Sequence, residues 1–247
     1  MPRRVAFFGA TGGCANACLA YTLQGGHSAI ALVRRPEVLR EQLRKREIAD
    51  EVVESQLCIV EGDVKDITSV AEVIANGGNG VDTIISGIGG PPTPQSSLLR
   101  PLTTTDPGIC HKATCNILAA LKDSKDAAST LLVIISANGV LNDSPRDYPL
   151  ALLPLYAWLL RGVFDDKRAM ETALMKTKPT GGYVVVRPSV LDSGPSKGMH
   201  SVREGTMEQP VQGYGIGRDD VGLWIYSRVV ETEDRSALYN QGFQIRY

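Results

Sequence analysis

A glycine-rich run near the N-terminus combines residue types and spacing that suit phosphate binding. It reads Gly9-Ala10-Thr11-Gly12-Gly13-Cys14-Ala15, fits the pattern GxxGxxA and directly follows the apolar run VAFF. In such a loop Gly9 makes a tight turn, Gly12 admits backbone N–H groups to a pyrophosphate, and a small Ala15 lets helix and strand pack closely. The alternative is a glycine turn without a ligand. We expect a dinucleotide-binding loop made of Gly9, Thr11, Gly12, Gly13, Cys14 and Ala15.

Two arginines follow at the place where a dinucleotide site reads the adenosine ribose. The second apolar run ends Ala31-Leu32-Val33-Arg34-Arg35 and carries no Asp or Glu there. A carboxylate at this position binds a ribose 2′-hydroxyl, whereas a guanidinium suits a 2′-phosphate. Arg34 and Arg35 therefore predict NADP(H) as the cofactor, the alternative being a solvated strand end.

The surrounding chain supplies the elements that would position these groups. Six near-continuous apolar runs read as strands buried on both faces, with helical patterns between them. This alternation predicts an α/β fold, a single Rossmann-like doubly wound parallel sheet over residues 1–247. The expected strands are 5–8, 29–33, 57–60, 81–86, 131–136 and 183–187, and the expected helices are 13–24, 36–46, one from Asp66 and one from Ile109.

Two long irregular stretches, 89–106 and about 188–218, follow expected strand ends. Loops of this length in a compact domain are usually functional or disordered, and ligands of open α/β sheets bind beyond the carboxyl ends of the strands. We expect both stretches to shape the substrate site, the second as a small C-terminal substrate lobe.

Composition narrows the classes of partner. With 26 Lys and Arg against 27 Asp and Glu, the net charge is −1, which gives no broad basic surface for nucleic acid or membranes. Five cysteines without CxxC spacing indicate a reduced, cytoplasmic chain, and three separated histidines predict no metal site. The apolar window 149–164 is too short to span a membrane, so it is expected to form a pocket wall or a subunit interface, as in a homodimer.

Seven segments in order resemble the atypical short-chain dehydrogenase/reductases, particularly the NmrA-like and flavin-reductase-like NAD(P)H-binding group. They are FFGATGGCANACLAYTLQGGHSAIALVRRPE, EGDVKD, ISGIGG, IISANGV, DDKRAMETAL, YVVVRPSVLDSGP and GRDDVGLWI, and they span nearly the whole chain. The resemblance implies that Asp63 and Val64 edge the adenine, that Ser86 and Gly87 run under the cofactor, and that Pro188 approaches the nicotinamide.

The catalytic pattern departs from the usual one in this family, which pairs a tyrosine proton donor with a lysine four residues later. No YxxxK occurs here, but Lys167 and Glu171 match the second half of the extended form YxxxKxxxE, with Val163 at the tyrosine position. The resemblance implies that Lys167 holds the cofactor ribose. A solvated helix lysine paired with Glu171 is the alternative.

Other groups are candidates for the missing donor. The family keeps a serine near the substrate where Ser136 ends the fifth strand, and Tyr148 lies in a loop that could reach back. A hydroxyl of ordinary pKa would orient a carbonyl or relay a proton from water, and a strand-end serine can instead bond backbone. Tyr156 and His200 are further candidates.

The first hypothesis for function is an NADP-dependent oxidoreductase acting on a small cyclic or aromatic carbonyl or quinone-like compound. Conjugated acceptors such as quinones take hydride with little help from a protein acid. A non-catalytic NADP-binding redox sensor is the second hypothesis, and a dehydratase, isomerase or cyclase on the same fold is the third. The small size of the chain and its expected substrate lobe resemble accessory reductases of secondary metabolism.

Overall fold

The computed structural model describes residues 2–97, 101–140, 151, 154 and 158–247. Its core is an eight-stranded sheet in the order β10-β12-β8-β7-β4-β1-β2-β3, in which every neighbouring pair is parallel except β10 with β12. The chain thus winds in both directions from β1, as the predicted doubly wound sheet requires. The strands are β1 Arg4–Phe8, β2 Ser28–Val33, β3 Leu57–Glu61, β4 Thr83–Ser86, β7 Leu131–Ile135, β8 Tyr183–Pro188, β10 Arg203–Gly205 and β12 Gln241–Arg246.

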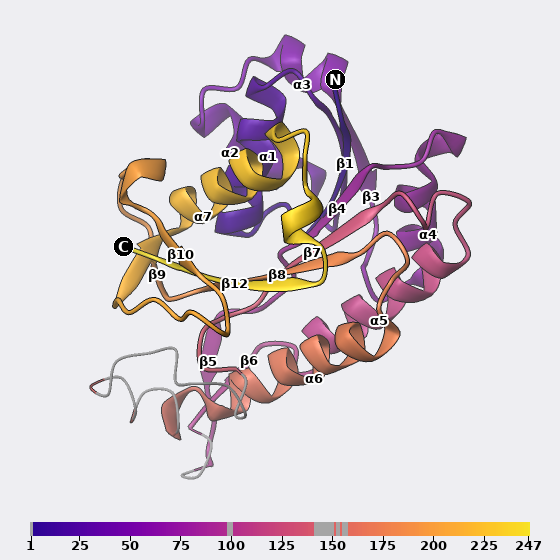
Figure 1. Ribbon diagram of the computed structural model, residues 1–247. Helices are drawn as coiled ribbons and strands as arrows, with labels where there is room; N and C mark the ends of the chain where they lie inside the picture. Colours follow the sequence, from indigo (N-terminus) through magenta and orange to yellow (C-terminus); the bar gives the residue numbers. More distant parts are fainter. Residues whose placement is uncertain (1, 98–100, 141–150, 152–153, 155–157) are drawn as a thin grey trace.

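Helices cover both faces of this sheet, because alternate strand residues point to opposite faces and both sets are apolar (Figure 1). One face, with Val5 and Phe7, packs on α1, α2, α3 and α7. The other face, with Ala6 and Phe8, packs on α4, α5 and α6. The helices are α1 Gly13–Gln24, α2 Pro36–Lys45, α3 Asp50–Gln56, α4 Ile67–Ala75, α5 Ile109–Lys122, α6 Arg161–Thr177 and α7 Arg218–Ile225, with short helical turns at Asn76–Gly78, Met199–Ser201, Tyr226–Glu231 and Ser236–Leu238.

The two long stretches contain small sheets of their own. β5 Pro92–Pro94 pairs antiparallel with β6 Leu102–Thr104, and β9 Val190–Asp192 pairs parallel with β11 Gly215–Gly217. Both small sheets follow the carboxyl ends of central strands, so they border the edge where α/β proteins bind ligands.

The predicted parallel sheet is confirmed, and all six expected strands form with ends within two residues of the predicted ones. The sequence did not predict β12, because Gln244 and Arg246 interrupt its apolar pattern although both side chains are buried. Within the described residues, no helix is long and apolar enough to span a membrane. Of the apolar window 149–164, Val163 and Phe164 pack beside Val140, and half of the other residues lie outside the described ranges.

Candidate functional site

The predicted phosphate loop turns sharply between β1 and α1. Gly9 has a φ of +78°, a conformation that side chains disfavour, and the Gly12 N–H donates to the Gly9 carbonyl at 2.8 Å. Gly12 is the N-cap residue of α1, and no side chain in the described part of the protein caps this helix. The first N–H groups of α1 are therefore left for a ligand, and a helix N-terminus favours an anionic one.

Close backbone packing beneath the loop explains its small residues. A Cβ atom on Gly9 would lie 2.9 Å from the backbone of Gly87, and one on Gly87 would lie 2.7 Å from the Ala15 Cβ. β1 and β4 are neighbours, so the loops that leave them touch at these positions. Because Gly9 and Gly87 have no side chains, the loop forms a shallow cradle that fits the pyrophosphate of a dinucleotide.

A cleft of about 210 Å³ runs along the carboxyl ends of β1, β2, β3 and β4. Seven of the predicted cofactor residues line it: Gly9, Thr11, Gly12, Arg34, Asp63, Val64 and Gly87. Seven others do not line it: Gly13, Cys14, Ala15, Arg35, Ser86, Lys167 and Pro188.

The cleft also has a wall that was not predicted residue by residue. Gly89, Gly90, Thr105 and Asp106 line it from the two ends of the stretch that carries β5 and β6. Only the length of that stretch hinted at this role. Lys65 forms an ion pair with Asp106 at 2.5 Å, which ties the wall to the segment that follows β3.

Arg34 and Arg35 directly follow the end of β2. Both side chains are exposed, and neither guanidinium forms a hydrogen bond or ion pair with another described residue. Arg35 is the N-cap residue of α2, whereas Arg34 lines the cleft itself. Arg34 is thus a cation beside the expected adenosine ribose with its donors available.

The segment expected at the adenine is held in place by α5. The buried Asn116 side chain donates to the backbone carbonyls of Val64 at 2.8 Å and Lys65 at 2.9 Å. The Asp63 carboxylate accepts the Lys65 N–H at 2.9 Å. These contacts fix the turn after β3, and none of them involves Arg34.

Lys167 lies on α6 against the carboxyl end of β7. Its ammonium donates to the carbonyls of Ile135 at 3.1 Å and Ser136 at 3.4 Å. Burial raises the pKa of the Cys14 and Cys110 thiols to about 12, and the Lys167 charge opposes the shift at both. Lys167 therefore lies close enough to act on the first turns of both α1 and α5.

Ser136 is buried and belongs to a network with a charged pair. Its hydroxyl donates to the Glu171 carboxylate, which also accepts two hydrogen bonds from Arg187 Nε at 3.2 Å and one from Arg187 Nη2 at 2.7 Å. Glu171 and Arg187 are 0% and 2% exposed. Glu171 therefore pairs with Arg187, and the alternative ion pair with Lys167 does not form.

The remaining candidates are spread. Val163 is buried beside Val140 and Phe164, so no hydroxyl stands at the position of the family tyrosine. Pro188 is buried at the end of β8, and His200 is exposed. Tyr148 and Tyr156 lie outside the described residues.

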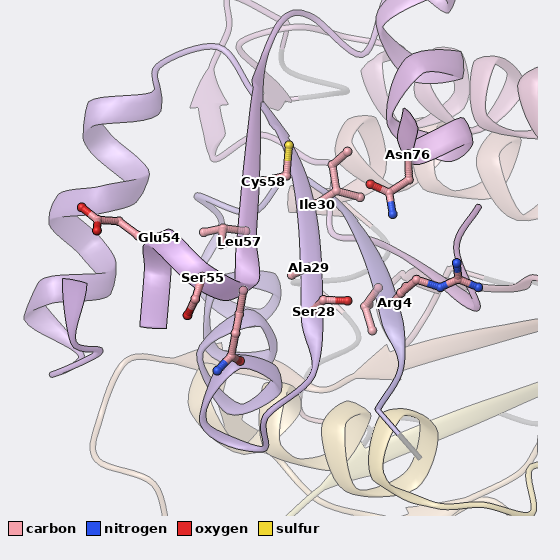
Figure 2. A pocket seen from close by; sticks show the side chains of 11 residues that line it. Arg4, Ser28, Ala29, Ile30, Glu54, Ser55, Leu57, Cys58 and Asn76 are labelled. Carbon is pink, nitrogen blue, oxygen red and sulfur yellow. The ribbon is translucent and has the colours of Figure 1, made fainter. Parts of the chain in front are cut away.

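A second hollow lies at the opposite, amino edge of the sheet. It has a volume of about 380 Å³, and its lining comes from the starts of β1, β2 and β3 and the end of α3 (Figure 2). Arg4, Ser28 and Cys58 are among its lining residues, none of which was predicted to bind a ligand. In the described ranges, no group of three His, Cys, Asp or Glu side chains is placed to hold a metal ion.

The chain is similar to two fungal proteins along nearly its whole length. It is 36% identical to Reductase pytE of Aspergillus terreus, covering 98% of this chain and 97% of that one. It is 34% identical to Oxidase pynE of Aspergillus niger, covering 92% of each chain. Both names describe oxidoreductases.

Among solved structures, ChuY, an anaerobillin reductase from Escherichia coli O157:H7, matches with a TM-score of 0.65 at 18% identity. The match covers 98% of this chain and 96% of that one. The same fold occurs in epimerase/dehydratase-like and NADH-flavin reductase-like proteins.

A model of the NAD(P)H-binding family matches residues 9–231, from the phosphate loop to the end of the helical turn after α7. The cleft and the cradle described above lie within this match. The chain therefore belongs to the NAD(P)H-binding family.

Proposed function

We propose that this protein is an NADP(H)-dependent oxidoreductase that transfers hydride to or from a small cyclic or aromatic carbonyl or quinone-like compound. One observation carries the choice of NADP(H): Arg34 lines the same cleft as Gly9 and Gly12 and has no partner among the described residues. A guanidinium there can fork onto the oxygens of a 2′-phosphate. The fungal origin of both named relatives favours a place in secondary metabolism.

Lys167 holds the cofactor ribose in this proposal. An ammonium has three N–H donors, and two of them bond the carbonyls of Ile135 and Ser136. The third remains for a ribose hydroxyl at the carboxyl edge of the sheet. Because β7 fixes the ammonium by backbone atoms, its position does not depend on a tyrosine beside it.

A nicotinamide held in this cleft would supply or accept hydride at its C4 atom. When a carbonyl is reduced to an alcohol, the oxygen also takes up one proton, for which Val163 offers no donor. We assign this proton to solvent water. The arrangement suits quinone-like acceptors, whose conjugation carries the charge that follows hydride transfer.

Deuterium transfer tests the proposal. The protein is incubated with NADPH deuterated at nicotinamide C4 and with a cyclic ketone, an aromatic aldehyde or a naphthoquinone. The expected result is deuterium on the carbinol carbon of the ketone or aldehyde product, or NADPH consumption with the quinone. Tight NADPH binding with no turnover across such a panel would instead favour a redox sensor. A product of unchanged mass, or one lighter by one water, would indicate a non-redox reaction.

A further inference from the structure

Arg218, the first residue of α7, lies directly against the phosphate loop. A Cβ atom on Gly13 would come within 2.4 Å of the Arg218 Cδ, so the arginine stem occupies the space that a side chain on Gly13 would fill. α7 approaches α1 this closely because Gly222 lacks a side chain, and a Cβ there would lie 2.5 Å from the Ala17 Cβ. Tight helix packing thus places a guanidinium beside the first turn of α1.

The Arg218 guanidinium has no carboxylate partner among the described residues. Its Nη1 donates to the Ser193 hydroxyl at 2.8 Å, and within the described ranges the guanidinium forms no ion pair and no other hydrogen bond. The adjacent Asp219 instead pairs with Arg46 at 2.7 Å. Donors on Arg218 therefore remain for an anion.

The charge of Arg218 adds to a site that already favours an anion. The N-terminus of α1 carries a partial positive charge, and a neighbouring guanidinium adds a full one. The charge of Arg218 opposes the burial-driven rise in the pKa of Cys14, which agrees with its closeness to that first turn. Two positive groups side by side select for a phosphate.

The space next to Arg218 adjoins the cofactor cleft at Thr11. A hollow of about 480 Å³ is lined by Thr11, Gly13, Ser193 and Arg218 with residues of α2, and Thr11 also lines the cofactor cleft. Thr11 and Gly13 flank the Gly12 backbone, over which the pyrophosphate is expected to lie. A guanidinium on this side can therefore reach a phosphate seated on the loop.

We propose that Arg218 binds the pyrophosphate of the nicotinamide dinucleotide and, through Ser193, couples the cofactor to the segment expected to form the substrate lobe. This inference rests on the proposed function, since it takes the same cofactor cleft to be occupied by NADP(H). It adds a cationic group from the C-terminal part of the chain to a site that the glycine pattern defines at the N-terminus. The pyrophosphate is common to NADPH and NADH, so Arg218 should serve both, whereas Arg34 should serve NADPH alone.

Nucleotide titrations by nicotinamide fluorescence test this distinction. Arg218→Met keeps the aliphatic stem over Gly13 and removes the charge, so we expect it to raise the Kd of NADPH and of NADH alike, by about tenfold or more. Arg34→Ala should raise the Kd of NADPH only. Arg40→Ala is the matched control, because Arg40 is exposed on α2 and has no partner in the described part of the chain. It should bind both nucleotides within about twofold of wild type.

Three outcomes separate the inference from the proposed function. If wild type binds neither nucleotide, the proposed function fails. If Arg218→Met binds both as tightly as Arg40→Ala does, or loses affinity for NADPH alone, the pyrophosphate assignment is wrong. Circular dichroism reports whether the variant folds, and Arg218→Lys, which keeps the charge, should recover part of the lost affinity for both nucleotides.

Hydrogen exchange provides a second readout. In wild type, saturating NADPH should slow exchange in the segment around Ser193, and Ser193→Ala should reduce that protection. Equal protection in Ser193→Ala and wild type would contradict the coupling.

Discussion

The hydroxyl of Ser136 donates a hydrogen bond to the carboxylate of Glu171 on α6. The backbone carbonyl of Ser136 accepts a hydrogen bond from Lys167, which lies one helical turn before Glu171 on the same helix. A hydroxyl has one hydrogen to donate. While it is given to Glu171, Ser136 cannot also donate to a substrate carbonyl. The same contacts hold α6 against the end of β7, so Ser136 and Glu171 position Lys167.

Ser136→Ala tests this role. We expect the variant to keep kcat within about threefold of wild type and to lose roughly 1 kcal/mol of unfolding free energy, because Arg187 still satisfies the Glu171 carboxylate. Steady-state kinetics and urea denaturation measure the two quantities. A fall in kcat of about a hundredfold, with NADPH affinity intact, would place the hydroxyl on the substrate instead.

The Glu171 and Arg187 pair should be strongly coupled. Breaking it from one side with Glu171→Met or Arg187→Met leaves a buried charge and should cost about 3–5 kcal/mol of unfolding free energy. The double variant should lose much less unfolding free energy than the two single variants lose together, since neither charge then remains. Denaturant unfolding of the four proteins completes the cycle, and additive losses would mean that the two side chains act independently.

Lys167→Met should raise the KM for NADPH and lower kcat/KM by about ten- to a hundredfold, because the variant loses the charge-assisted contact that we propose to the ribose. Lys176→Met is the control on the same helix, since Lys176 is exposed and forms no hydrogen bond or ion pair with other described residues. Equal kinetics in the two variants would remove Lys167 from the site.

Acid should weaken the segment around Asp220 at the start of α7. Burial disfavours the Asp220 carboxylate, but the N–H groups of Lys197 and Gly198 and the hydroxyls of Ser196 and Tyr247 donate to it and hold its pKa below the usual value. A lowered pKa stabilises the folded state above the unfolded-state pKa, and this contribution is lost as pH falls through the folded-state pKa.

Asp220→Asn should therefore be less stable than wild type at neutral pH, with the gap closing below about pH 4. Thermal unfolding of both proteins across this range measures the gap. A gap that stays constant with pH would show that the Asp220 charge contributes nothing.

The central sheet could be predicted because strands that are buried on both faces consist of unbroken apolar residues, as in Leu131–Ile135. β12 could not, since Gln244 and Arg246 occupy buried positions in it. Its neighbour Arg187 is accommodated by Gly242, where a Cβ would lie 2.2 Å from the guanidinium. Such polar pairing across strands leaves no periodic signal in the sequence.

The candidate site also has one part that the sequence predicts and another that it does not. The phosphate loop is local, so its spacing alone predicts the turn at Gly9. The pairing of Ser136 with Glu171 and the approach of Arg218 to Gly13 join segments far apart in the chain. They depend on how α6 and α7 pack, which residue spacing does not encode.

The most direct test of NADP(H) as the cofactor is a titration of wild type, Arg34→Ala, Arg35→Ala and the double variant with NADPH and with NADH. We predict that wild type prefers NADPH, and that the double variant loses this preference while its NADH affinity stays within about twofold. Equal affinity of wild type for the two nucleotides, or an unchanged preference in the double variant, would contradict the assignment.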